Sequence, residues 1–171
     1  MPCIPLSPAT ITWRRSLVVL GILLVVPLAT ATASTPPRIA VFDFEMVDTS
    51  GEAFTQDQQR RLRLATQEMR KLLAERDGVL AINVEPERQA ITEAGYLRNC
   101  TGCIEPIARR LGADLALLGT VHKVSSLILY IAVTIFDAES GAAIKNATVS
   151  IRGDTDTAWL RGVRYIVRNK L

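Results

Sequence analysis

The chain has 171 residues, which is enough for one domain with its own hydrophobic core. Its formal net charge is +3, and the first 33 residues contain two of the 20 basic residues and none of the 17 acidic ones, so the remainder is close to neutral. This balance argues against a nucleic-acid partner and against binding to a charged membrane surface.

The first 33 residues have the pattern of a secretory leader. Arg14 and Arg15 precede the apolar run Leu17–Leu28, which is too short to span a bilayer comfortably, and small residues follow it. We expect a cleaved signal peptide over residues 1–33, cut after Ala31 or Ala33; the alternative is an uncleaved membrane anchor. The predicted location is an oxidising compartment, most simply a bacterial periplasm, without stable membrane insertion after cleavage.

After a short linker over residues 34–38, a first strand is predicted over Ile39–Phe44. The polar stretch Glu45–Ala53 is predicted to be a loop. Thr55 and Gln58 match a capping box, which predicts a helix that begins there and ends near Gly78. Its apolar residues recur at helical spacing and indicate the buried side: Leu62, Ala65, Met69, Leu72 and Leu73.

Shorter elements are predicted in the middle of the chain. A strand over Val79–Val84 precedes a helix that begins at Glu85 with proline in its first turn and ends at Gly95. Tyr96–Gly102 is predicted to be a loop, and Ile104–Leu111 a third short helix.

The stretch that follows predicts two strands, Asp114–Val121 and Leu127–Phe136. The residues between them form a polar corner: His122, Lys123, Ser125 and Ser126. Both alternating residue sets of the second strand are largely apolar, so we expect both of its faces to be covered. After a turn at Gly141, Ala142–Arg152 is predicted to be a more polar strand near a sheet edge, and Asp154–Arg168 a helix with one apolar side.

The predicted order is β-α-β-α-α-β-β-β-α, which is typical of an α/β (α+β) domain with a mixed sheet of about five strands. Its last three strands form an antiparallel meander, and a helix that packs on the sheet follows them. We expect residues 39–171 to form this single domain.

Several stretches resemble known bacterial proteins. Three are similar to the small periplasmic domain shared by TolB N-terminal domains, CsgG-like curli-secretion proteins and LpoB-type activators of peptidoglycan synthases: IAVFDFE, LGADLALLGTV and FDAESG. Two longer ones resemble a bacterial family of secreted proteins of unknown function: RNCTGCIEPIARRLGAD and IRGDTDTAWLRGVRYIVRNKL. The resemblance implies a non-enzymatic module that docks on another envelope protein, and it assigns no functional residue.

Cys100 and Cys103 have the most chemically suggestive spacing in the chain. Cysteine pairs in exported proteins are usually oxidised, so the main interpretation is a structural disulfide that pins the loop to the following helix. Two alternatives stay open. One is a redox-active dithiol, with Cys103 near a helix N-terminus, and the other is a soft-metal site, for copper(I) for instance. Two thiolates alone make a poor zinc site, and we expect no resident metal or cofactor.

The sequence contains no catalytic constellation, and we expect a protein without enzymatic activity. Asp43 lies near the end of the first strand and is interpreted as a capping or ion-pairing residue. His122 is interpreted as a surface residue that forms hydrogen bonds, in preference to a catalytic base.

The last predicted helix contains the better candidate for a binding site. Arg161, Arg164 and Arg168 recur on one side of it, with Tyr165 beside them. The pattern fits a solvated basic surface at a helix C-terminus, and it also fits a docking site for an acidic partner or an anionic polymer.

Our hypothesis is therefore a periplasmic, non-enzymatic binding or assembly accessory module that acts through protein–protein contacts. The expected partner is an envelope protein. The alternative is a small periplasmic protein that handles thiols or soft metals through Cys100 and Cys103.

Overall fold

The computed structural model describes residues 35–171, and the predicted signal peptide over residues 1–33 lies outside this range. Its strands (β), α-helices (α) and 3-10 helices (η) follow in the order β1 (Arg38–Val41), β2 (Glu45–Asp48), α1 (Gln56–Ala74), β3 (Leu80–Ile82), η1 (Glu85–Glu87), α2 (Arg88–Ala94), η2 (Leu97–Asn99), α3 (Ile104–Arg110), β4 (Leu115–Lys123), β5 (Ile128–Asp137), β6 (Ala143–Arg152) and α4 (Asp156–Asn169). None of the helices within residues 35–171 has the length and apolar character that a membrane crossing requires.

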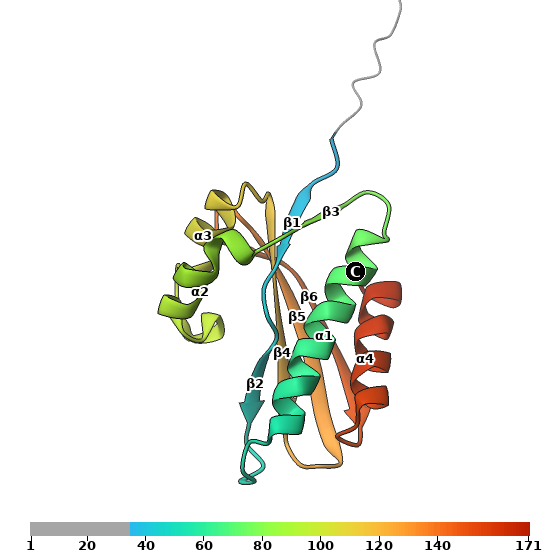
Figure 1. Ribbon diagram of the computed structural model, residues 1–171. Coiled ribbons are helices and arrows are strands. Elements are labelled where there is room, and N and C mark those ends of the chain that lie inside the picture. Colours follow the sequence, from blue (N-terminus) through green and yellow to red (C-terminus); the bar gives the residue numbers. More distant parts are fainter. Residues whose placement is uncertain (1–34) are drawn as a thin grey trace, which may run out of the picture. The chain divides into compact units, whose positions relative to one another are not determined.

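A six-stranded mixed sheet has the order β3-β1-β4-β5-β6, and β2 also pairs with β4 (Figure 1). β1 and β2 run parallel to β4, one after the other along its length, and β3 runs parallel to β1. β4, β5 and β6 are antiparallel neighbours. These pairings confirm the mixed sheet, the C-terminal meander and the helix that follows it.

The prediction of a loop over Glu45–Ala53 was wrong at its start, because Glu45–Asp48 forms β2. Val47 of this strand pairs with His122 of β4. Between β1 and β2 the chain leaves the ladder, and the Phe44 N–H donates instead to Thr66 Oγ1 of α1, at 2.9 Å. A four-residue strand that depends on such a distant partner has little signal of its own in the sequence.

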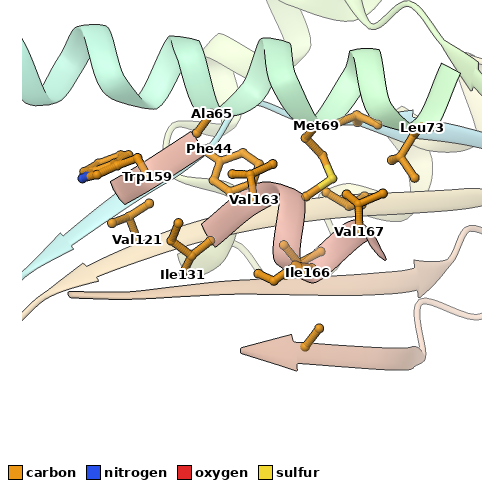
Figure 2. Close-up of a cluster of buried hydrophobic side chains, with 14 of the residues drawn as sticks. Phe44, Ala65, Met69, Leu73, Val121, Ile131, Trp159, Val163, Ile166 and Val167 are labelled. Atoms are coloured by element: carbon orange, nitrogen blue, oxygen red, sulfur yellow. The ribbon is translucent and has the colours of Figure 1, made fainter. Parts of the chain in front are cut away.

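α1 and α4 lie side by side over one face of the sheet and form the larger core with it (Figure 2). α1 begins at the predicted capping box, in which Thr55 Oγ1 accepts from the Gln58 N–H at 3.2 Å and Gln58 Oε1 accepts from the Thr55 N–H at 3.0 Å. The helix ends at Ala74, a few residues before Gly78. Side chains from the sheet side and from both helices meet in this core: Phe44, Ala65, Met69, Leu73, Val121, Ile131, Trp159, Val163, Ile166 and Val167.

The opposite face of the sheet is covered only at one end, by α2, η2 and α3. A second core lies there, in which Phe42 and Leu118 of the central part of the sheet contact Ile107 and its neighbours. Further along β5 this face is open, and Tyr130 is 39% exposed. The prediction that both faces of Leu127–Phe136 are covered was therefore wrong, because the three short helices do not reach that far.

The polar corner also begins later than predicted, because β4 continues through His122 and Lys123. Lys123 is only 1% exposed, and its Nζ lies 2.7 Å from Glu52 Oε2 and 3.4 Å from Asp48 Oδ2. Burial opposes the charge of Lys123, but the bonds to Glu52 and Asp48 outweigh it and raise the pKa of the lysine above its ordinary value.

Candidate binding surface

α4 turns its apolar side to the sheet and its basic side to solvent. The helix begins after Thr155, whose Oγ1 accepts from the Ala158 N–H at 3.3 Å. A Cβ at Gly162 would lie 2.8 Å from side-chain carbon atoms of Ile131 and Ile151. Because Gly162 has no side chain, α4 can lie close to β5 and β6.

A groove of about 290 Å³ lies between α4 and β6. It is lined by Val149, Ile151 and Arg152 of β6 and by Arg161, Gly162 and Tyr165 of α4, among others. Tyr165 is 47% exposed, and no carboxylate lines the groove. Arg152 and Arg161 are exposed and take part in none of the ion pairs that residues 35–171 form. The groove is thus an apolar surface bordered by two arginines that lack a carboxylate partner within residues 35–171.

The structure separates the other two predicted arginines from this groove. Arg164 is ion-paired with Glu68 of α1. Arg168 is exposed and borders a different hollow, beside Arg76. The part of these two residues in partner binding stays a prediction. Arg152, which the sequence analysis did not single out, lies at the same groove as Arg161; no spacing rule relates a strand residue to a helix residue, so the sequence alone gave no signal for it.

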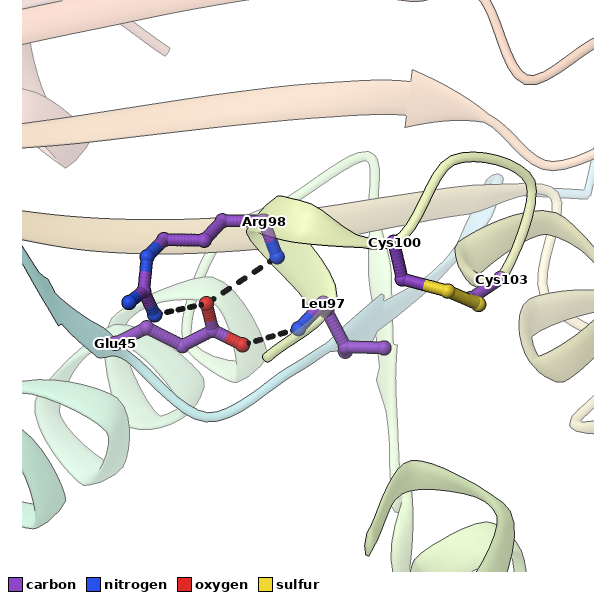
Figure 3. Close-up of a disulfide and its surroundings, with 5 residues drawn as sticks. All are labelled: Glu45, Leu97, Arg98, Cys100 and Cys103. Carbon is purple, nitrogen blue, oxygen red and sulfur yellow. Dashed lines mark hydrogen bonds and ion pairs between the residues drawn. A yellow bond between two sulfur atoms is a disulfide. The ribbon is translucent and has the colours of Figure 1, made fainter. Parts of the chain in front are cut away.

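Cys100 and Cys103 lie together at the other end of the domain, with their Cα atoms 5.6 Å apart and their sulfur atoms joined as a disulfide (Figure 3). Cys100 directly follows η2 and Cys103 directly precedes α3, so the bridge ties these two elements together. Among residues 35–171, no group of three or more His, Cys, Asp or Glu side chains is arranged to hold a metal ion. The role of the pair stays a prediction.

Glu45 lies beside the cysteine loop and fixes η2 in place (Figure 3). Its carboxylate accepts from the Leu97 N–H at 2.6 Å, and from the backbone N–H and the guanidinium of Arg98 at 3.2 and 2.9 Å. Arg98 also lies over the ring of Tyr96, 4.0 Å from its centroid, as a cation–π pair. Tyr96 and Phe54 line a second groove of about 260 Å³. Glu45 was not predicted as a structural anchor, because Glu45–Ala53 was predicted to be a loop.

Asp43 and His122 do not share a site. The Asp43 carboxylate accepts from Arg70 at 2.9 Å and from Arg88 at 2.6 Å, which confirms its interpretation as an ion-pairing residue. The Nε2 atom of His122 lies within hydrogen-bond distance, 2.9 Å, of Thr49 Oγ1. This histidine is therefore a hydrogen-bonding residue, as predicted.

A network of ion pairs joins the beginnings of α1 and α4. The Asp156 carboxylate accepts from Arg60 at 2.6 and 3.0 Å and from Arg61 at 3.0 Å. These hydrogen bonds, first from Arg60 and then from Arg61, lower the pKa of Asp156 to about 2. Asp154 accepts from Arg61 at 3.1 Å and from Trp159 Nε1 at 3.0 Å. The network holds the beginnings of α1 and α4 together.

Comparison with known proteins shows the family and the fold. A family model described as "Protein of unknown function (DUF2380)" matches residues 37–171. No curated protein sequence matches the chain significantly. Among solved structures, the hypothetical protein CT253 from Chlamydia trachomatis has a TM-score of 0.54 at 11% identity, over 78% of this chain and 94% of that one.

Two structures of LpoB from Escherichia coli have the same fold. The NMR structure has a TM-score of 0.51 at 13% identity, over 88% of this chain and 80% of that one. The C-terminal domain has a TM-score of 0.50 at 14% identity, over 72% of this chain and 88% of that one. At these identities the likeness concerns the fold alone.

Proposed function

We propose a function for this chain, which belongs to the family described as "Protein of unknown function (DUF2380)": it is a periplasmic, non-enzymatic binding or assembly accessory module. The family description names no activity, so the proposal is argued from the surface of the domain. It acts through protein–protein contacts with an envelope protein. The proposal includes export through a signal peptide over residues 1–33 and a single domain over residues 39–171. The resemblance of the sequence to LpoB-type activators supports a module of this kind.

The groove between α4 and β6 is the observation that carries this proposal. Tyrosine and arginine are two of the three residue types enriched at the energetic hot spots of interfaces, and Tyr165 and Arg161 are both exposed here beside an apolar wall. A partner that covers the groove removes Arg161 from water, which is costly unless a carboxylate of that partner pairs with the guanidinium. The groove therefore favours a protein partner with carboxylates beside an apolar contact.

Replacement of Arg161 by Glu tests the proposal. The tagged protein is used to capture its partner from an envelope extract, and the amount of the protein enriched by the wild type is compared with that enriched by Arg161→Glu. We expect a loss of roughly tenfold or more, because a charge that attracted a carboxylate now repels it. Arg63→Glu is the matched control, since Arg63 is an exposed arginine of α1 outside the groove. Equal capture by both variants, at unchanged Tm, contradicts the proposal.

A second candidate function, thiol or soft-metal handling, rests on the accessibility of the disulfide. Cys100 and Cys103 are half-buried, and Thr101 and Gly102 between them are exposed, so another thiol can reach the bridge. This candidate predicts that the bridge opens in a glutathione redox buffer and that the reduced protein binds copper(I). A bridge that stays closed in millimolar dithiothreitol, together with no copper(I) binding after reduction, contradicts it.

A further inference from the structure

β6 is an edge strand with a long unpaired side. It spans Ala143–Arg152 and pairs only with β5 among residues 35–171. An unpaired edge presents a row of backbone donors and acceptors that can hydrogen-bond to another extended segment. In this domain the same edge borders the groove beneath α4.

The register shows which backbone groups of β6 point outward. Just beyond the strand, the Gly153 N–H donates to the Leu127 carbonyl at 3.0 Å. Hydrogen-bonded and non-hydrogen-bonded pairs alternate in an antiparallel ladder, so the odd-numbered residues before Gly153 bond to β5. Thr148 and Ser150, which pair with Ala132 and Tyr130, therefore direct their N–H and C=O groups away from the sheet.

The charge around this edge identifies the kind of segment that fits it. β6 contains Lys145 and Arg152 but no acidic residue, and Arg161 stands over the groove on the α4 side. Antiparallel pairing of two copies of β6 would bring two basic edges together without a carboxylate to face them. An acidic segment of a different protein has the opposite charge and is favoured over a second copy.

We propose that the partner binds by adding an extended segment, in which acidic and apolar residues alternate, to the outer edge of β6. Its backbone continues the ladder at Thr148 and Ser150. One alternate set of its side chains enters the groove beside Tyr165 and Arg161, and the other set lies on the open face of the sheet. This inference rests on the proposed function and specifies the chemistry of the partner.

A proline at position 148 tests strand addition separately from charge. Thr148 is exposed and its N–H points outward, so Thr148→Pro removes an edge donor and no bond to β5. Thr148→Val keeps the N–H and serves as the matched control. The probe is a fluorescent seven-residue peptide of alternating glutamate and valine, and fluorescence anisotropy measures its binding to the purified protein. We expect Thr148→Pro to bind it up to about tenfold more weakly than Thr148→Val, as for the loss of one backbone hydrogen bond.

Two altered peptides complete the experiment without any change to the protein. A peptide with lysine in place of glutamate should bind at least about tenfold more weakly, because the edge is basic. A glutamate–valine peptide that is N-methylated at alternate residues should also lose binding, since it lacks the donors that pair with β6. The N-methylated peptide tests strand addition even if Thr148→Pro lowers the Tm of the protein.

Strand addition is overturned if the glutamate–valine peptide does not bind, or if it binds equally well with and without N-methylation. It is also overturned if the protein forms a dimer in solution that Thr148→Pro converts to a monomer, because a second copy then occupies the edge. If Arg161→Glu abolishes partner capture while N-methylation changes nothing, the proposed function stands and strand addition falls. If capture survives Arg161→Glu, the proposed function falls instead.

Discussion

Asp154 shows how one residue can connect several parts of this domain. Its carboxylate accepts from Arg61 of α1 and from the indole N–H of Trp159, whose ring is buried in the larger core. The indole N–H of a buried tryptophan needs an acceptor, and Asp154 supplies it at the beginning of α4. In the sequence, Asp154 forms an Arg-Gly-Asp tripeptide with Arg152 and Gly153, but the aspartate is turned inward to this network and is held by it.

Asp156, next to it, should make the stability of the protein depend on pH in acid. Its pKa of about 2 lies below the ordinary value of 3.8, because the folded state favours the carboxylate. The stabilisation is therefore present above about pH 4 and is lost as the pH falls towards 2. We expect Asp156→Asn to be less stable than the wild type at pH 7 and to differ little from it near pH 2, as measured by urea unfolding. Asp77→Asn, at an exposed aspartate, is the control; a gap between Asp156→Asn and wild type that persists near pH 2 contradicts the assignment.

At the scale of elements, Gly162 determines how close α4 lies to the sheet. The helix packs over β5 and β6 through Trp159, Val163 and Ile166, and Gly162 is the point of closest approach. The depth of the groove between α4 and β6 depends on this packing, because Gly162 lines it together with Arg161 and Tyr165.

Gly162→Ala should therefore destabilise the protein, although alanine is the better helix former. The new methyl group meets Ile131 and Ile151 at 2.8 Å, and overpacking of this kind typically costs about 1–3 kcal/mol. The gain in helix propensity offsets up to about 1 kcal/mol of that cost. Urea unfolding measures the difference, with Arg161→Ala on the exposed side of the same helix as the control. A variant more stable than the wild type would show that α4 lies further from the sheet.

Local signals predicted most of the elements correctly. The capping box at Thr55 and Gln58 begins α1, and Gly95 and Gly141, both with positive φ, lie at the predicted helix end and turn. These features depend only on neighbouring residues, so they can be read from a short stretch of sequence. β2 could not be read in this way, because Glu45–Asp48 is a strand only by virtue of its pairing with β4.

The candidate surface was predicted only in part, for the same reason. Helical spacing placed Arg161 and Tyr165 together correctly, but it could not show that Glu68 of α1 binds Arg164. Neither could it show that Arg152 lies at the same groove, since the two elements meet only in the folded domain. Periodicity therefore identified the helix face, whereas tertiary packing decides which of its arginines are available.

At the scale of the whole molecule, two hydrophobic cores lie on opposite faces of one sheet, and different elements cover them. The larger core lies between the sheet and the long helices α1 and α4. The smaller core, which contains Leu97 and Ile104, lies under short elements that the Cys100–Cys103 bridge ties together. The smaller core should therefore open locally before the larger one does.

Cys100→Ser combined with Cys103→Ser tests this difference. A bridge that closes so short a loop is worth only about 2 kcal/mol by chain entropy, so the variant should fold with a lowered Tm. Hydrogen exchange should accelerate in η2 and α3, including the Leu97 amide that donates to Glu45, while the amides of α1 and α4 stay protected. Loss of protection in α1 and α4 to the same extent would mean that the two cores unfold as one unit.

The position of β1 in the sheet has a consequence for synthesis on the ribosome. Within residues 35–171, β1 is the first strand to be made, but it lies between β3 and β4, and α4 covers the sheet only after β6. The apolar residues of β1 therefore cannot be buried until most of the polypeptide has left the ribosome, since contacts between residues far apart in the sequence form late. Under the proposed export, a translocation machinery that accepts only unfolded substrates would meet this polypeptide before its core has closed.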